Sequence, residues 1–160
     1  KTLAAVAREG GAAAALANIR LGAAAAAAGK TTEALANFEA AATDRSIDPL
    51  LADYARLQTA MLKVDTADWT EMQNRLNDLA TDSSPWRHSA REILGLAALR
   101  LDRTDDARAN FEKLLGDRST PQGIAERARI AMATLTAAAL AKAPPAAAPA
   151  AAESGKGEKK

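Results

Sequence analysis

Apolar residues recur at three- and four-residue steps along most of this chain, and that spacing predicts amphipathic helices. The first segment shows it in Leu16, Ile19, Ala23 and Ala26, which fall on one helical face. The pattern predicts seven helices, over residues 2–28, 32–43, 49–63, 67–80, 86–101, 105–115 and 122–142. An all-α fold follows from this reading.

Local signals place the helix boundaries. The first helix is expected to be continuous, although Gly10–Gly11 loosens it, and to end at Gly29, because glycine commonly stands just past the last turn. Thr31 or Thr32 is expected to cap the second helix. Asp48–Pro49 combines a capping carboxylate with proline at the first helical position, which is typical of a helix start.

One pattern of small and aromatic residues occurs twice. The pattern begins with a glycine and has an alanine twelve residues later. A phenylalanine follows four residues after the alanine, and a small or aliphatic residue comes after it. The set is Gly22, Ala34, Phe38 and Ala41, and 73 positions later it is Gly95, Ala107, Phe111 and Leu114. This spacing is typical of tetratricopeptide repeats, in which small residues let paired helices approach and a ring fills the gap to the next unit.

The sequence therefore predicts a right-handed, tetratricopeptide-like solenoid of helical hairpins over residues 1–142. Units are expected near 15–48, 53–86 and 88–121, followed by a C-terminal capping helix over 122–142. Three units and a terminal helix are close to the minimum for a stable stack, because each unit buries its apolar face only against its neighbours. Residues 143–160 contain mainly Pro, Ala, Gly, Ser and charge, a composition that predicts a disordered tail.

Composition agrees with thin, closely packed helical layers. Hydrophobic residues make up 48% of the 160 residues, but alanine supplies much of this share and aromatic residues only 3%. Alanine favours helices while burying little area per side chain. The net charge of +1 argues against a nucleic-acid surface, which usually needs a basic stripe. The absence of cysteine excludes disulfides and thiolate metal sites.

No segment of the sequence is expected to span a membrane. The most apolar window, 11–29, is mostly alanine and contains Asn18 and Arg20, so it falls short of about 20 strongly apolar residues. The chain begins with Lys1 rather than Met, which is expected of a fragment or a processed product. A membrane anchor upstream of Lys1 remains compatible with this reading.

The residues that most resemble catalytic groups have simpler explanations. His88, the only histidine, has no serine or cysteine in a nucleophile-elbow context and is expected to pack or cap a helix start. Asp105–Asp106 are adjacent on a helix and do not face each other, so they are expected to favour the helix N-terminus. Gly29–Lys30–Thr31 lacks the glycine spacing of a phosphate-binding loop. The sequence predicts no enzyme, no cofactor and no metal site.

A concave groove is the more promising surface. In tetratricopeptide stacks the first helix of each unit lines it. The side chains expected there are Leu16, Ile19, Ala23, Tyr54, Leu57, Met61, Ser89, Glu92, Leu96 and Arg100. Repeat proteins that grip a C-terminal carboxylate place Lys, Asn and Arg at positions that are apolar here, so that clamp is absent. The groove either receives an apolar or amphipathic segment of a partner or is covered by the chain's own terminal helices.

The stretch from Ser84 to Leu135 resembles a known family. It contains Pro85–Trp86–Arg87, Ser89–Ala90–Arg91–Glu92 and Gly95–Leu96–Ala97–Ala98–Leu99, followed by Ala107–Arg108, Phe111, Leu114–Leu115, Asp117, Pro121 and Arg127–Ala128. The run is similar to the tetratricopeptide-like domain of the ancillary Sec translocon subunit family, especially its alphaproteobacterial members. Residues 48–62 resemble that family too, and the resemblance as a whole extends over about 130 residues of the helical region.

This resemblance implies a location and a role. Family members are inner-membrane proteins with one membrane helix and a periplasmic repeat domain. They associate with the translocon and with a periplasmic folding factor and assist newly exported proteins. The expected function is therefore non-catalytic protein binding, as the periplasmic part of a membrane-anchored export accessory. The alternative is a structural oligomerisation or general adaptor module, for which the sequence predicts a stable dimer that buries Leu57 and Met61.

Overall fold

A computed structural model describes residues 2–142, and all regular elements in that range are helical. The helices are α1 (Leu3–Val6), α2 (Gly11–Ala27), α3 (Thr31–Thr43), α4 (Pro49–Lys63), α5 (Trp69–Leu76), α6 (Arg87–Arg100), α7 (Thr104–Gly116) and α8 (Gln122–Lys142), with a 3₁₀ turn, η1 (Asp78–Ala80), after α5. The predicted all-α class is confirmed. The predicted tail, 143–160, lies outside the described residues.

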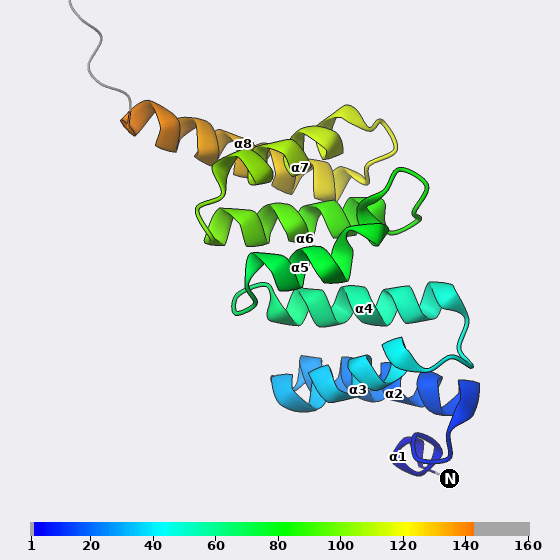
Figure 1. Ribbon diagram of the computed structural model, residues 1–160. Coiled ribbons are helices and arrows are strands. Elements are labelled where there is room, and N and C mark those ends of the chain that lie inside the picture. The colour runs from blue at the N-terminus through cyan, green and yellow to red at the C-terminus, as the bar shows by residue number, and fades with distance from the viewer. Residues whose placement is uncertain (1, 143–160) are drawn as a thin grey trace, which may run out of the picture.

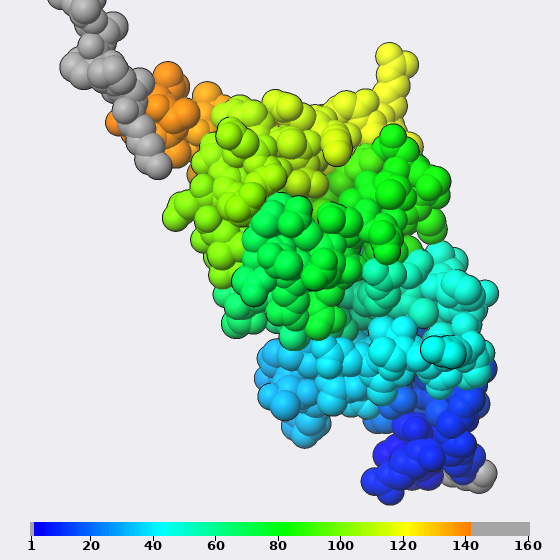
Figure 2. All heavy atoms as spheres, in the orientation of Figure 1, coloured from blue at the N-terminus to red at the C-terminus, as the bar shows by residue number. Residues whose placement is uncertain are grey.

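The helices follow one another along an elongated body (Figure 1). α2 pairs with α3, α3 with α4, and α6 with α7, and α8 closes the described part of the stack at the end opposite α1 (Figures 1 and 2). Within the part of the chain that the structure describes, no helix is long and apolar enough to cross a membrane.

Two expectations about the N-terminal helices are wrong: the continuity of the first helix and the cap of the second. The first segment is two helices rather than one, because Gly10 and Gly11 adopt the left-handed φ values of 79° and 78°. Glycine reaches this region without the steric cost that other residues meet, so the pair turns the chain between α1 and α2. Neither Thr31 nor Thr32 caps α3. Lys30 occupies the cap position without a side-chain hydrogen bond, and Thr31 is already helical.

Other boundaries agree with the sequence. Asp48 caps α4 by accepting a hydrogen bond from the Leu50 N–H at 2.8 Å, and Pro49 is the first helical residue. α8 has the predicted bounds. The helix predicted to reach Ala80 instead stops at Leu76 and continues as η1, so α5 has only eight residues.

The 73-residue repeat extends into the turns between helices. The residue before the cap of α3, Gly29, has a φ of 72°, and Asp102 holds the corresponding place before α7 with a φ of 55°. In both turns the cap N–H bonds back to a carbonyl of the preceding helix at 2.9 Å: Lys30 to Ala25, and Arg103 to Ala98. The turn geometry is therefore duplicated together with the helices.

The duplication also includes the exits from the two helices. Asp44 ends α3 and accepts a hydrogen bond from the Ser46 N–H at 2.8 Å, and Asp117 ends α7 and accepts one from the Ser119 N–H at 2.9 Å. The next helices, α4 and α8, begin 73 positions apart at Pro49 and Gln122. The segment α2–α3–α4 is thus repeated as α6–α7–α8, with α5 and η1 between the copies.

Each copy contains one glycine against one phenylalanine ring. A Cβ atom at Gly22 would lie 3.0 Å from the Phe38 ring, and one at Gly95 would lie 2.7 Å from the Phe111 ring. Both rings are almost completely buried. At Gly95 a side chain would overlap the ring, and at Gly22 the ring would have to shift slightly, so both glycines allow the close helix approach that the spacing predicted.

The core is divided into three clusters along the stack. The first joins α2, α3 and α4 around Phe38, the second joins α4, α5 and α6, and the third joins α6, α7 and α8 around Phe111. The second cluster contains most of the bulky aliphatic side chains: Leu57, Met72, Leu76, Leu79, Ile93 and Leu94. Each cluster is shared only by helices that are close in sequence.

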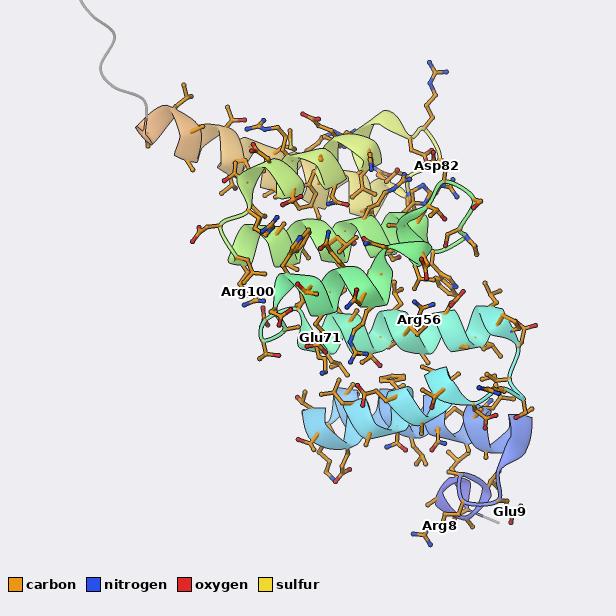
Figure 3. The ribbon with its side chains drawn as sticks, in the orientation of Figure 1. Arg8, Glu9, Arg56, Glu71, Asp82 and Arg100 are labelled. Atoms are coloured by element: carbon orange, nitrogen blue, oxygen red, sulfur yellow. The ribbon has the colours of Figure 1, made fainter. Side chains whose placement is uncertain are left out.

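Charged side chains tie the short helix α5 to its neighbours. Glu71 pairs with Lys63 of α4 at 2.7 Å and with Arg75 at 3.0 Å, and Arg75 also reaches Glu39 of α3 at 3.1 Å. Figure 3 marks Glu71 beside the α4–α5 region. The hydrogen bond from Lys63, assisted by Arg75, lowers the pKa of the Glu71 carboxyl. These pairs fix how α5 sits over α4.

Candidate protein-binding surfaces

The side chains predicted to line a groove differ widely in exposure. The exposed ones are Leu16, Ala23, Met61, Leu96 and Arg100, the half-buried ones are Ile19, Tyr54 and Ser89, and the buried ones are Leu57 and Glu92. All belong to α2, α4 and α6, as the sequence predicted. The exposed members remain candidates for contact with a partner.

Leu57 and Glu92 are occupied within the chain. Leu57 is 6% exposed and packs in the cluster with Met72 and Ile93. Glu92 is 5% exposed and accepts two hydrogen bonds from the Arg127 guanidinium of α8, at 2.5 and 2.9 Å. This pairing raises the pKa of Arg127. At these two positions the chain's own helices provide the cover: α5 and α6 over Leu57, and α8 over Glu92.

Arg100 and Tyr54 also have partners inside the molecule. The Arg100 guanidinium donates to the Val64 carbonyl at 2.7 Å and to the Ala67 carbonyl, so it joins the end of α6 to the α4–α5 turn (Figure 3). The Tyr54 ring lies 5.7 Å from the Trp86 ring, centre to centre. Both residues contribute to the contact between α4 and α6.

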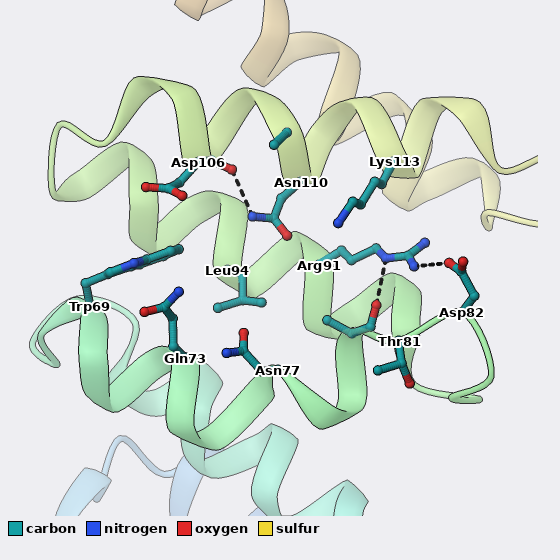
Figure 4. A pocket seen from close by; sticks show the side chains of 12 residues that line it. Trp69, Gln73, Asn77, Thr81, Asp82, Arg91, Leu94, Asp106, Asn110 and Lys113 are labelled. Carbon is teal, nitrogen blue, oxygen red and sulfur yellow. Dashed lines mark hydrogen bonds and ion pairs between the residues drawn. The ribbon is translucent and has the colours of Figure 1, made fainter.

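A different hollow lies on the face formed by α5 and α7. Its volume is about 610 Å³, and α6, on which both helices pack, forms its floor (Figure 4). We call it the α5–α7 cleft. Its lining residues are Trp69, Gln73, Asn77, Ala80, Thr81, Asp82, Arg91, Leu94, Asp106, Ala109, Asn110 and Lys113. A cavity of this size is within the range of ligand sites, although its lining is more polar than most.

Three carboxamides face each other across this cleft. Gln73 projects from α5, Asn77 from the position that caps its C-terminal end, and Asn110 from α7 (Figure 4). The side chains of Gln73 and Asn77 form no hydrogen bond with any residue in the range 2–142, and the Asn110 amide nitrogen donates to the Asp106 carbonyl at 2.8 Å while its oxygen stays available. Each carboxamide can both donate and accept, so the cleft offers unpaired groups of both kinds.

Positively charged side chains stand at both ends of the cleft, but their pairing differs. At one end the Arg103 guanidinium lies 5.0 Å from the centre of the Trp69 ring. At the other end Arg91 is buried and donates to the Ala80 carbonyl at 3.0 Å and to Asp82, while the Lys113 ammonium forms no ion pair with a described residue. A second hollow of about 450 Å³ continues past Lys113 towards Arg87 and Asp117.

Sequence reasoning missed this cleft. Gln73 and Asn77 are four residues apart, as are Asp106 and Asn110, and each pair therefore occupies one helical face. Two polar stripes of this kind could have been noticed. Their juxtaposition could not, because it depends on the shortness of α5 and on the way both helices lie across α6.

His88, Asp117 and Ser119 meet at the α7–α8 turn, but their geometry does not form a catalytic triad. His88 Nε2 lies 2.8 Å from Asp117 Oδ2 and 3.4 Å from Ser119 Oγ, so the acid and the hydroxyl approach the same ring nitrogen. The Ser119 hydroxyl itself donates to Asp117 at 2.6 Å. A triad needs the acid on one ring nitrogen and the hydroxyl on the other. The cluster instead joins the start of α6 to the end of α7.

Residues 2–142 contain no group of three or more histidine or carboxylate side chains placed to hold a metal ion.

Comparison with family models, with curated proteins and with solved structures finds no match to this chain. The functional argument therefore depends on the chain's own surfaces.

Proposed function

We propose that this chain is a non-catalytic protein-binding module, built as a right-handed tetratricopeptide-like solenoid, and that the α5–α7 cleft binds an extended segment of a partner polypeptide. The single observation that carries the proposal is the set of carboxamides on facing helices, Gln73, Asn77 and Asn110, which are unpaired or half-paired. The duplicated helical hairpins, with their matching turns, support the proposed tetratricopeptide-like architecture.

An extended polypeptide fits the chemistry of this cleft. Its backbone offers an N–H donor and a carbonyl acceptor at every residue, and a carboxamide can pair with both. Hydrogen bonds to the backbone do not depend on the partner's side chains, so such a cleft can bind segments of many different sequences. The Lys113 ammonium adds a preference for an acidic side chain at its end of the cleft.

The proposed setting is the periplasmic face of a bacterial inner membrane. The resemblance of residues 84–135 to the ancillary Sec translocon subunit family supports this setting, and a backbone-binding cleft suits a protein that meets newly exported chains. The partners proposed on this basis are translocon components or a periplasmic folding factor, with a membrane anchor upstream of Lys1.

Selection from a displayed library of short random peptides tests the binding proposal. Peptides that bind the full chain are measured by isothermal titration calorimetry against the wild type and against Asn77→Ala with Asn110→Ala. We expect the double variant to bind roughly tenfold more weakly or worse, because the hydrogen bonds of two carboxamides contribute about 0.5–1.5 kcal/mol each.

The duplication provides a matched control. Asn37 occupies the position of Asn110 in the first copy and makes the same bond, to the Glu33 carbonyl at 2.7 Å, outside the cleft. Asn37→Ala should leave peptide affinity unchanged. Equal affinity of the cleft variant, or failure to select any binding peptide, would overturn the proposal. Recovery of translocon components from a membrane extract by the wild type, and not by the cleft variant, would support the export setting.

A further inference from the structure

The internal duplication identifies a second surface, on the outside of α8. α4 and α8 hold the same place in the two copies and begin 73 positions apart, so their residues correspond in helical register. Leu57 and Ala60 of α4 correspond to Ile130 and Ala133 of α8. The elements that cover Leu57 and Ala60 therefore indicate what kind of element fits on Ile130 and Ala133.

In the first copy, helices of the same chain cover this face. Leu57 is 6% exposed and Ala60 is completely buried, in the cluster that α5 and α6 form on α4. α6 contributes small and aliphatic side chains to that contact, with Ile93 and Leu94 as the larger ones. The face of α4 is thus a docking site for a helix, and it is filled.

In the second copy the same face is apolar and open. Ile130 is 59% exposed and Leu140 is 71% exposed, and the alanines between them, Ala133 and Ala137, are exposed as well. α4 ends at Lys63, whereas α8 continues to Lys142, so steps of three and four residues extend the stripe from Ile130 to Leu140, over about 15 Å of helix. We call Ile130, Ala133, Ala137 and Leu140 the α8 outer face.

An end helix of a repeat stack normally presents a polar outer side, because nothing covers it. α8 instead has large aliphatic side chains opposite its buried side, where Ala128, Ala131 and Leu135 pack against the core. Ala133 at the centre of the outer face corresponds to Ala60, which is completely buried where α5 and α6 cover α4. These features match an unfilled repeat position rather than a solvent-exposed cap.

We propose that a helix of a partner protein, carrying small and aliphatic residues on one face as α6 does, docks on the α8 outer face and continues the stack. The proposal adds a second contact to the proposed binding function, but it is argued from the duplication and does not depend on the cleft.

A second copy of this chain stacked head to tail fits the face poorly. In a head-to-tail stack, α2 of the next copy would take the place that α6 takes on α4. Where α6 has Ile93, α2 has Arg20, and α1 packs on α2 at that end of the molecule. A charged side chain at the centre of an apolar contact is costly to desolvate. The chain therefore does not offer its own N-terminal end as the missing helix.

The test uses a fluorescent synthetic peptide with the sequence of residues 68–101, the segment that fills the face of α4. Anisotropy titration against the full chain should show saturable binding. Ile130→Glu should weaken that binding roughly tenfold or more, because docking would bury the new carboxylate without a partner. Since Ile130 is 59% exposed, the melting temperature of this variant should remain that of the wild type.

Controls separate this surface from the others. Leu115→Glu, on an exposed part of α7, should bind the peptide as the wild type does, and so should the cleft variant Asn77→Ala with Asn110→Ala. The proposal is overturned if the wild type does not bind the peptide, if Ile130→Glu binds it equally, or if sedimentation equilibrium shows a wild-type dimer that Ile130→Glu dissociates. The last result would assign the face to a second copy.

Discussion

At the scale of single residues, two glycines decide how closely the helices pair. Glycine inside a helix normally costs about 1 kcal/mol relative to alanine. Here that cost is offset by the approach of a phenylalanine ring to the backbone, since a Cβ atom would lie 2.7 Å from Phe111 at Gly95 and 3.0 Å from Phe38 at Gly22. The two sites have the same chemistry but differ in how much room remains.

We expect Gly95→Ala to destabilise the protein by about 1–3 kcal/mol through overpacking. Gly22→Ala should cost clearly less, because the new Cβ atom overlaps the Phe38 ring less and alanine has the better helix propensity. Gly95→Leu should cost roughly 2–4 kcal/mol. Urea denaturation of the three variants measures the order. A Gly95→Ala variant as stable as the wild type would contradict the close approach of Phe111.

Asp117 is the residue whose charge is most strongly perturbed. Hydrogen bonds from the Ser119 hydroxyl and N–H, then from His88 and Arg87, hold the pKa of its carboxyl well below the ordinary value of 3.8. A carboxyl with a lowered pKa stabilises the folded state above its ordinary pKa, and that contribution is lost as the pH falls below it. The two helix ends that meet here should therefore separate more easily in acid.

Asp117→Asn keeps an acceptor for Ser119 but removes the charge that faces Arg87 and His88. The variant should be less stable than the wild type at pH 7, and the difference should shrink as the pH falls below about 4. Urea denaturation at several pH values measures this. Asp44→Asn is the matched control, because Asp44 makes the same turn with Ser46 but pairs with neither a histidine nor an arginine in the described structure. A difference independent of pH would refute the role of the charge.

At the scale of helices, the sequence predicted what depends on local pattern. The bounds of α4 and α8 followed from a cap, two prolines and the apolar stripe, and the glycine–phenylalanine pairs followed from spacing. The break at Gly10–Gly11 was underestimated because one helix pattern continues on both sides of it. The burial of Leu57 was left undecided, because an apolar helix face looks the same in sequence whether a partner or the chain itself covers it.

Variants at Leu57 and Met61 distinguish a side chain that the chain itself covers from one that is open to a partner. Leu57→Glu should destabilise the protein by about 3 kcal/mol or more, since it buries an unpaired charge in the central cluster. Met61→Glu should change stability by less than about 0.5 kcal/mol, because that side chain is 44% exposed. Thermal melts of the single variants are sufficient. Equal stability of both variants would show that α5 and α6 do not cover Leu57 in solution.

At the scale of the whole molecule, the two candidate surfaces arise from departures from regular repetition. The cleft exists where α5 is shorter than α3 and α7, and the α8 outer face exists where the described stack ends without a covering hairpin. Neither could be predicted from the sequence alone, because each depends on elements that are missing or short relative to their repeated counterparts. The regular parts of the stack hold these two places at fixed positions.

The three separate core clusters have a mechanical consequence. The cluster around Phe38 is built mainly from alanines, while the central one holds the bulky aliphatic side chains. Cohesion therefore grows from the N-terminal end towards the middle, and within residues 2–142 α8 packs on α6 and α7 rather than on the N-terminal helices. A pulling force applied at the N-terminal end should therefore unfold α1 to α3 first, while the α5–α7 cleft and α8 stay folded.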